Sequence, residues 1–170
     1  MATSVSQYAA CRLVEDRTLK LETEAGRGNH YSGIIVTEDM LLVIDRMAWN
    51  LQIYSRRDGK LMSASHRLED RPGCVCLISK TEVAVYLSDC KIVILSFKSI
   101  DDVKRVKTLH VWTGFDFCDS VAKLNSSDKL IVSGVKDDNM FCWCVVNLTD
   151  GRVDSTHNIC KGGFFSTSHL

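Results

Sequence analysis

The sequence lacks an excess of charge of either sign, because 21 lysines and arginines balance 21 aspartates and glutamates. A zero net charge removes the simplest argument for nucleic-acid binding, which favours a basic excess. No apolar run reaches about 18 residues, so a transmembrane helix is excluded on length. The first residues also lack a basic start followed by an apolar core, which excludes a secretory signal of the usual form. These absences predict a cytoplasmic protein with no membrane contact.

Common catalytic and cofactor motifs are missing as well. The sequence contains no His-Glu-x-x-His zinc motif, no Gly-x-Ser-x-Gly nucleophile elbow and no glycine-rich phosphate loop. Two pairs of cysteines, Cys74 with Cys76 and Cys142 with Cys144, are separated by one residue each. Zinc sites usually leave two to four residues between paired thiols. The expectation is therefore a non-enzymatic protein without cofactor or metal, whose reduced cysteines are buried as small hydrophobic residues.

Short apolar runs joined by turn residues dominate the segment from Ser32 to Gly59. The runs cover residues 33–36, 41–44 and 51–54, and each is too short for a helix but rich in Val, Ile and Leu. This pattern is typical of β-strands connected by tight turns. Asp58-Gly59 predicts a hairpin whose two central residues both have positive φ, and a fourth strand from about Lys60 to Leu68.

The same plan of four strands repeats twice along the rest of the chain. Taking Gly33, Gly73, Asp119 and Gly163 as equivalent starting points, the steps are 40, 46 and 44 residues. A period of this length with four strands per unit indicates β-propeller blades. The predicted fold is all-β, an arc of about three four-stranded antiparallel blades from an incomplete six- or seven-bladed ring.

The predicted blades divide the chain as follows. A lead-in segment covers residues 1–16 and the partial propeller covers 17–170, with blades at about 32–68, 72–111 and 118–159. Residues 17–25 are expected to form the outer strand of a preceding blade, and residues 162–170 the start of a following one. The predicted arc has open blade edges at both ends. The chain is therefore either a fragment of a larger ring or one of two copies that associate with each other.

The first blade resembles the NHL-type blade found in many tripartite-motif (TRIM) proteins. The resemblance rests on Gly33-Ile34, Leu42 to Asp45, Asn50 to Tyr54 and Asp58-Gly59. The second blade keeps only its glycine start and its second strand, and the third matches in strand spacing alone. In that family the propeller supplies partner recognition to a ubiquitin-ligase machinery on other domains, and the RING and B-box zinc spacings of those domains are absent here.

Candidate binding residues come from the loops that emerge on one face of a propeller. These loops follow each second strand and connect each fourth strand to the next blade. Arginine, tryptophan and tyrosine are enriched at binding hot spots. The residues expected to contact a protein partner are Tyr31, Arg46, Trp49, Arg71, Trp112 and Phe115. For Phe115 and for Phe117, two residues further on, packing between neighbouring blades is the competing interpretation.

Two other functions remain open from the sequence. RNA binding, also known in the resembled family, would use basic and aromatic side chains of the same face for phosphate contact and base stacking. Those side chains are Arg27, Tyr31, Arg46, Trp49, Arg71 and Lys136. A calcium-dependent propeller hydrolase would use Asp45, Asp89 and Asp137 or Asp138, which follow the second strands. Aspartate after a strand also caps its own turn, so a binding module is the leading hypothesis.

Overall fold

The computed structural model describes residues 30–62, 66–97, 102–125, 127–136, 140–159 and 165–168, the last four and residue 159 by their backbone. These residues form strands and connections and include no helix, so none of them forms a helix that could cross a membrane. The strands are β1 (Tyr31–Val36), β2 (Met40–Asp45), β3 (Asn50–Ser55), β4 (His66–Arg67), β5 (Pro72–Ser79), β6 (Glu82–Leu87), β7 (Lys91–Phe97), β8 (Val103–His110), β9 (Phe117–Lys123), β10 (Lys129–Lys136), β11 (Met140–Asn147), β12 (Val153–Ile159) and β13 (Phe165–Ser168).

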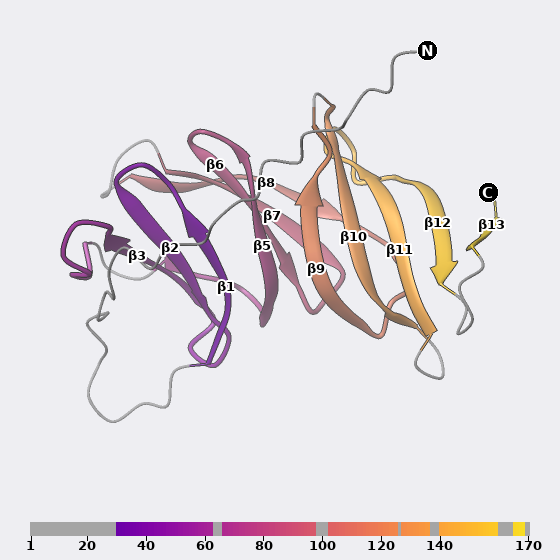
Figure 1. The fold of residues 1–170 in the computed structure, drawn as a ribbon, viewed down its shortest axis with the longest axis horizontal. Coiled ribbons are helices and arrows are strands. Elements are labelled where there is room, and N and C mark those ends of the chain that lie inside the picture. Colours follow the sequence, from indigo (N-terminus) through magenta and orange to yellow (C-terminus); the bar gives the residue numbers. More distant parts are fainter. Residues whose placement is uncertain are drawn as a thin grey trace, which may run out of the picture.

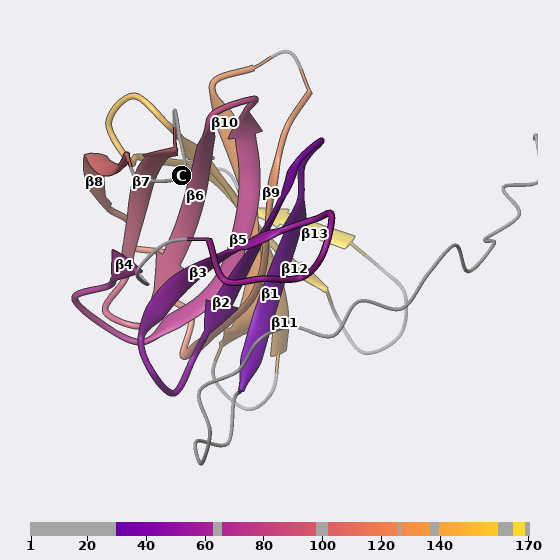
Figure 2. The ribbon, with the colours of Figure 1, turned by 90° about the vertical axis from the view of Figure 1, so that its left-hand side faces the viewer.

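The strands form three antiparallel sheets in which each strand pairs with its neighbour in the chain. The first sheet contains β1 to β4, the second β5 to β8, and the third β9 to β13. The sheets lie side by side as an open arc, as Figures 1 and 2 show from two directions. The first strands are adjacent, since β5 contacts both β1 and β9. The predicted all-β arc of three antiparallel blades is therefore confirmed.

The second sheet is covered on both faces and joins the two hydrophobic cores. Strand side chains alternate between faces, so Val83, Val85 and Leu87 of β6 enter the core shared with the first sheet. Ala84 and Tyr86 of the same strand enter the core shared with the third sheet. An apolar run without polar alternation, such as residues 82–87, is therefore explained by burial on both sides.

The hairpin at Asp58-Gly59 occurs where it was predicted, and a similar one is found at Asp150-Gly151, but both turns are longer than two residues. In the first, Ser55 N–H donates to Lys60 O and Gly59 N–H donates to Ser55 O, both at 2.9 Å. Gly59 and Gly151 have φ of 73° and 80°, whereas neither aspartate has a positive φ. The expected positive φ at both central residues was wrong, because a longer loop needs only its last residue in the left-handed region.

The fourth strand of the first sheet is shorter than the predicted span from Lys60 to Leu68. Among the described residues, β4 (His66–Arg67) and an isolated bridge between Tyr54 and Leu61 pair with β3, and Met62 N–H donates to Ile53 O at 2.8 Å. Leu68 N–H still donates to Trp49 O at 2.7 Å and closes the sheet at its end.

The end of the chain also differs from the expectation of a following blade. Strand β13 pairs antiparallel with β12 and extends the third sheet by a fifth strand. The outer edge of β12 presents unpaired backbone groups, and an added extended segment satisfies them. The predicted lead-in (1–16) and outer strand (17–25), together with Arg27, Asp137 and Asp138, lie outside the described residues.

Candidate recognition pocket between the sheets

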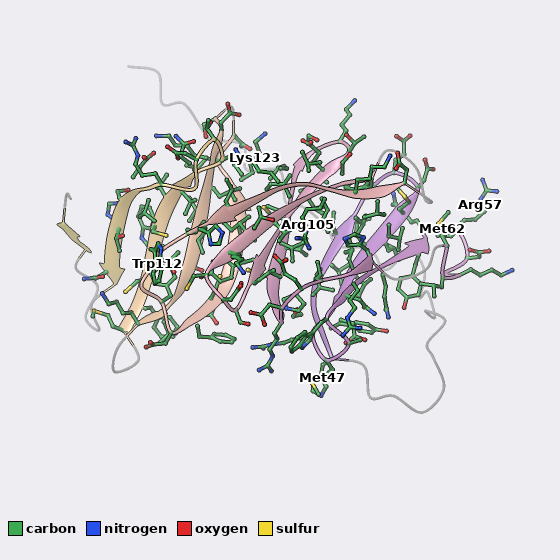
Figure 3. All side chains as sticks on the ribbon, turned by 180° about the vertical axis from the view of Figure 1, so that it is seen from behind. Met47, Arg57, Met62, Arg105, Trp112 and Lys123 are labelled. Carbon is green, nitrogen blue, oxygen red and sulfur yellow. The ribbon has the colours of Figure 1, made fainter. Side chains whose placement is uncertain are left out.

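Three connections meet at one end of the sheets and form what we call the loop face. They are residues 46–49 between β2 and β3, residues 88–90 between β6 and β7, and residues 111–116 between β8 and β9. Arg46, Ser88 and Asp116 from these three connections line one pocket, so the connections are neighbours in space. Figure 3 shows the side chain of Met47 projecting from this end of the first sheet.

The first connection is fixed by the aspartate that ends β2. Asp45 is buried, and its Oδ1 accepts hydrogen bonds from Met47 N–H at 2.9 Å and Ala48 N–H at 3.0 Å. Arg46 N–H donates to His30 O at 2.8 Å, which holds the connection against the start of β1. Asp45 thus caps the turn with its own side chain and sets the direction of the residues that follow.

The residue before the third strand adopts the same unusual backbone conformation in two sheets. Trp49 has φ of 54° and Cys90 has φ of 60°, a region that few non-glycine residues occupy. In both cases the carbonyl of that residue accepts a hydrogen bond from the backbone N–H of the residue that follows the fourth strand. The donors are Leu68, at 2.7 Å, and Val111, at 2.8 Å. This repeated hydrogen bond attaches the connections 46–49 and 88–90 to the outer edges of their own sheets.

The connection between the second and third sheets is held by Thr113, which is buried. Its Oγ1 accepts a hydrogen bond from Phe115 N–H at 3.3 Å and lies 3.3 Å from the Tyr86 hydroxyl oxygen. Asp116 N–H donates to Val135 O at 2.8 Å and so attaches the connection to β10. Phe115 is consequently directed into the core shared by these sheets and is only 8% exposed.

A pocket of about 190 Å³ opens among these connections. The first sheet contributes Arg46, and the remaining walls come from the second and third sheets. The other lining residues are Arg71, Pro72, Gly73, Tyr86, Ser88, Phe115, Asp116, Phe117 and Cys118. The pocket is therefore a product of all three sheets rather than of a single repeat.

Two arginines give the pocket its charge. The guanidinium carbon of Arg46 lies 4.9 Å from the centroid of the Phe117 ring, in a cation–π contact. Arg46 Nε is buried and has no hydrogen-bond partner. Arg71 is exposed, and its side chain takes part in none of the ion pairs found in the described part of the chain. The pocket thus presents guanidinium groups to a ligand.

The structure brings together some of the residues predicted to bind a partner and separates others. Arg46, Arg71 and Phe115 line the pocket. Trp49 (40% exposed) lies on the loop face, and Tyr31 (37% exposed) pairs with Asp45 at the same end of the first sheet. Trp112 is 84% exposed, does not line the pocket, and lies apart from Met47 in Figure 3.

Phe117 lines the pocket, although it was not among the residues predicted from the sequence to contact a partner. Its ring is 42% exposed and faces Arg46, although packing between blades was its competing interpretation. Residues two apart on a regular strand face the same side, so the spacing predicts a common direction for Phe115 and Phe117, whereas the structure buries the first ring and exposes the second. That spacing was the one available signal, and it could not show which ring is buried.

Acids and thiols near the pocket already have local partners. Asp89 pairs with Lys91, and Asp45 caps its own turn, so neither is directed at a shared ion. Among the residues that the structure describes, no group of three His, Cys, Asp or Glu side chains is placed to hold a metal. The Sγ atoms of the free thiols Cys74 and Cys118 lie 3.5 Å apart, and this contact, together with burial, raises the pKa of Cys118.

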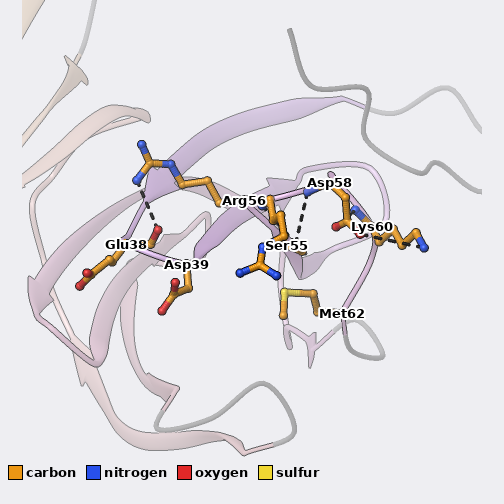
Figure 4. A pocket seen from close by; sticks show the side chains of 8 residues that line it. Glu38, Asp39, Ser55, Arg56, Asp58, Lys60 and Met62 are labelled. Atoms are coloured by element: carbon orange, nitrogen blue, oxygen red, sulfur yellow. Dashed lines mark hydrogen bonds and ion pairs between the residues drawn. The ribbon is translucent and has the colours of Figure 1, made fainter. Parts of the chain in front are cut away.

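A second hollow lies at the opposite end of the first sheet and is shown in Figure 4. It measures about 780 Å³ and is lined by charged residues of the β1–β2 and β3–β4 connections. Arg56 Nη1 donates to the carbonyls of Thr37 and Glu38 at 3.2 and 3.3 Å. A hydrogen bond with Ser55 lowers the pKa of Asp58. Arg56, Asp58 and Lys60 thus have partners within this hollow.

Comparisons with known proteins identify the fold but no family. No family model matches the sequence, and no curated protein matches it. The structure is similar to the β-propeller domain of Myceliophteria thermophila Cps50 (Swd1), with 13% identity, a TM-score of 0.58, and 81% of this chain and 45% of that chain covered.

Two further similar structures differ in length. Kuenenia stuttgartiensis hydrazine synthase gives a TM-score of 0.61 at 13% identity, covering 79% of this chain and 38% of that one. The computationally designed Ika4 protein gives 0.57 at 9% identity, covering 91% and 99%. The chain thus spans well under two thirds of the two natural proteins. At these identities the likeness concerns the β-propeller fold alone.

Proposed function

We propose that this chain is a non-enzymatic interaction module whose loop face binds a partner protein. The observation that carries the proposal is the pocket shared by all three sheets, with Arg46 and Arg71 in none of the ion pairs of the described residues and Phe117 partly exposed beside Arg46. Exposed arginine and aromatic side chains around a well-packed centre are the usual composition of a binding hot spot.

The size of the pocket supports recognition of a side chain over turnover of a metabolite. Sites for small molecules and cofactors typically enclose about 300–1,000 Å³. The pocket among the three sheets measures about 190 Å³. Around its walls, Ser88 donates to Asp70 Oδ1 and Cys118 is in contact with Cys74, and the lining residues include no histidine that could activate either group as a nucleophile.

The finer part of the proposal follows the resemblance of the first blade to NHL-type blades. We propose that the chain acts in the cytoplasm as the recognition part of a TRIM-like ubiquitin-ligase system. The strand that ends in Asp45 and the strand from Asn50 to Ser55, which carry that resemblance, are paired in register. They hold the connection 46–49 of the loop face between them, which places the resemblance next to the proposed contact surface.

Binding to RNA on the same face is the second candidate, favoured by the two guanidinium groups. Base stacking would require exposed aromatic faces beside them. Phe117 already lies against Arg46, and the exposed Trp112 does not line the pocket. A protein partner is therefore the better-supported choice. Added salt and nuclease should abolish an RNA complex and leave a protein complex largely intact.

Site-specific photo-cross-linking tests the proposed function. A photoreactive residue is placed at Met47 on the loop face or, as a matched control, at Val106 on β8, since the two side chains are 62% and 56% exposed. We expect a discrete protein adduct from position 47 that excess unmodified chain suppresses, and none from position 106. Equal adducts from both positions, or adducts removed by nuclease, would overturn the protein-binding proposal.

A further inference from the structure

We infer that the pocket between Arg46, Arg71 and Phe117 receives the carboxylate of an aspartate or glutamate side chain on the partner, an inference that rests on the proposed function. The partner segment is thus an acidic peptide region, and the pocket supplies the contact that selects it. Guanidinium groups match carboxylates because their planar N–H donors can form two parallel hydrogen bonds.

Arg46 is positioned to act as the main donor. Its guanidinium group is held 4.9 Å from the centroid of the Phe117 ring, and its backbone N–H is bonded to His30 O at 2.8 Å. Its Nε is buried without an acceptor. A buried donor without a partner is costly, so a ligand that brings an acceptor oxygen to Arg46 removes that cost on binding.

None of the ion pairs found in the described part of the chain joins an acid to Arg46 or Arg71. Asp70 Oδ1 accepts hydrogen bonds from Arg71 N–H at 2.6 Å and from Ser88 Oγ at 3.1 Å. Asp89 pairs with Lys91 at the neighbouring turn. Asp116 is the one carboxylate among the lining residues, against two guanidinium groups.

The charge balance in the pocket therefore favours an anion. The ring of Phe117 covers one face of the Arg46 guanidinium group. The rest of that group is left to bind a ligand. An incoming carboxylate would meet both arginines within a site partly shielded from solvent, where a charge-assisted hydrogen bond is stronger than at an open surface.

The dimensions of the pocket suit one acidic side chain. A volume of about 190 Å³ holds about six water molecules at the ~30 Å³ that each occupies in the liquid. The aromatic walls formed by Tyr86 and Phe115 would contact the methylene groups of such a side chain, while its carboxylate meets the arginines.

The experiment measures selection from peptide libraries with the full 170-residue chain. Each library has random flanking positions and a fixed central residue, which is glutamate, aspartate, glutamine or phosphoserine. We expect the glutamate or aspartate library to be enriched about tenfold or more over the glutamine library, as for a charge-assisted hydrogen bond. Arg46→Gln and Arg71→Gln should each remove that preference, and Arg57→Gln, at the opposite end of the first sheet, should leave it unchanged.

The controls separate this inference from folding and from the proposed function. Circular dichroism verifies each variant, and Arg71→Gln carries the test if Arg46→Gln does not fold, because Arg71 is exposed. Equal enrichment of the glutamine library, no enrichment at all, or a preference confined to phosphoserine would overturn the carboxylate assignment. So would a carboxylate preference that survives both arginine substitutions. If the cross-link from position 47 persists in any of these cases, the proposed function stands while the carboxylate inference fails.

Discussion

Substitution of Gly134 tests how closely β10 of the third sheet approaches the two phenylalanines that line the pocket. A Cβ atom at this position of β10 would lie 2.2 Å from Phe117 O and 2.8 Å from Phe115 Cδ2. Real Cβ atoms do not approach backbone oxygen so closely, and the backbone cannot rotate away as a flexible side chain can. Gly134→Ala must therefore displace β9 and the two phenylalanines that line the pocket.

The expected cost follows from overpacking. Inserting a methyl group into a packed site typically costs about 1–3 kcal/mol. For a domain of this size, each kcal/mol lowers the melting temperature by about 2–4 °C. We therefore expect Gly134→Ala to melt about 2–12 °C below the wild type, and to bind the partner more weakly because Phe115 and Phe117 move.

Gly73 is the matched control, since it also lines the pocket and lies in β5. Its added Cβ would meet Cys118 O at 3.4 Å and Tyr86 O at 3.8 Å, which are ordinary contacts. Gly73→Ala should therefore stay within about 0.5 kcal/mol of the wild type, as for a substitution without a specific clash. Differential scanning calorimetry measures both variants. Equal melting temperatures for the two would refute the close approach of β10 to Phe117.

Three further substitutions test the core, the loop and the buried thiols. Leu95→Ala, at a fully buried position of the core between the first two sheets, should cost about 2–5 kcal/mol in urea unfolding, and a loss below 1 kcal/mol would contradict that burial. Asp45→Ala should cost about 1–3 kcal/mol and weaken cross-linking from position 47, whereas Asp45→Asn keeps an acceptor oxygen and should recover most of both. Burial raises the pKa of Cys76 from 9.0 to about 11, so the folded state keeps a proton that the unfolded state loses. The contribution of Cys76 to stability should be constant below about pH 9 and fall between about pH 9 and 11, and Cys76→Ala should flatten part of the fall in that range. An unchanged alkaline pH profile in the variant would exclude Cys76 as a source.

Strand positions could be predicted because their causes are local. Runs such as residues 41–44 and 82–87 are β-branched, apolar and bounded by turn residues, and they became β2 and β6. The details of the turns depended on hydrogen bonds across the hairpin, which is why Asp58 does not have a positive φ. Strand β13 joined β12 because an open edge was available, a condition that no local pattern expresses.

The candidate pocket could be predicted only in part. Arg46 and Arg71 were identified from their place in loops of one face, and the structure brings them into the same pocket. Phe115 and Phe117 could be distinguished only once Thr113 and Asp116 fixed the connection against Tyr86 and β10. Such a site depends on packing between sheets, so its residues come from four connections that are distant in sequence, with Arg71 in the one that joins β4 to β5.

Deuterium exchange with and without the cross-linked partner tests the central claim most directly, because it reports protection along the whole chain. We expect slower exchange on binding in residues 46–49, 88–90 and 111–117, which surround the pocket. Protection confined to residues 37–39 and 56–60 at the opposite end, or to β11 and β12 of the third sheet, would contradict recognition by the loop face.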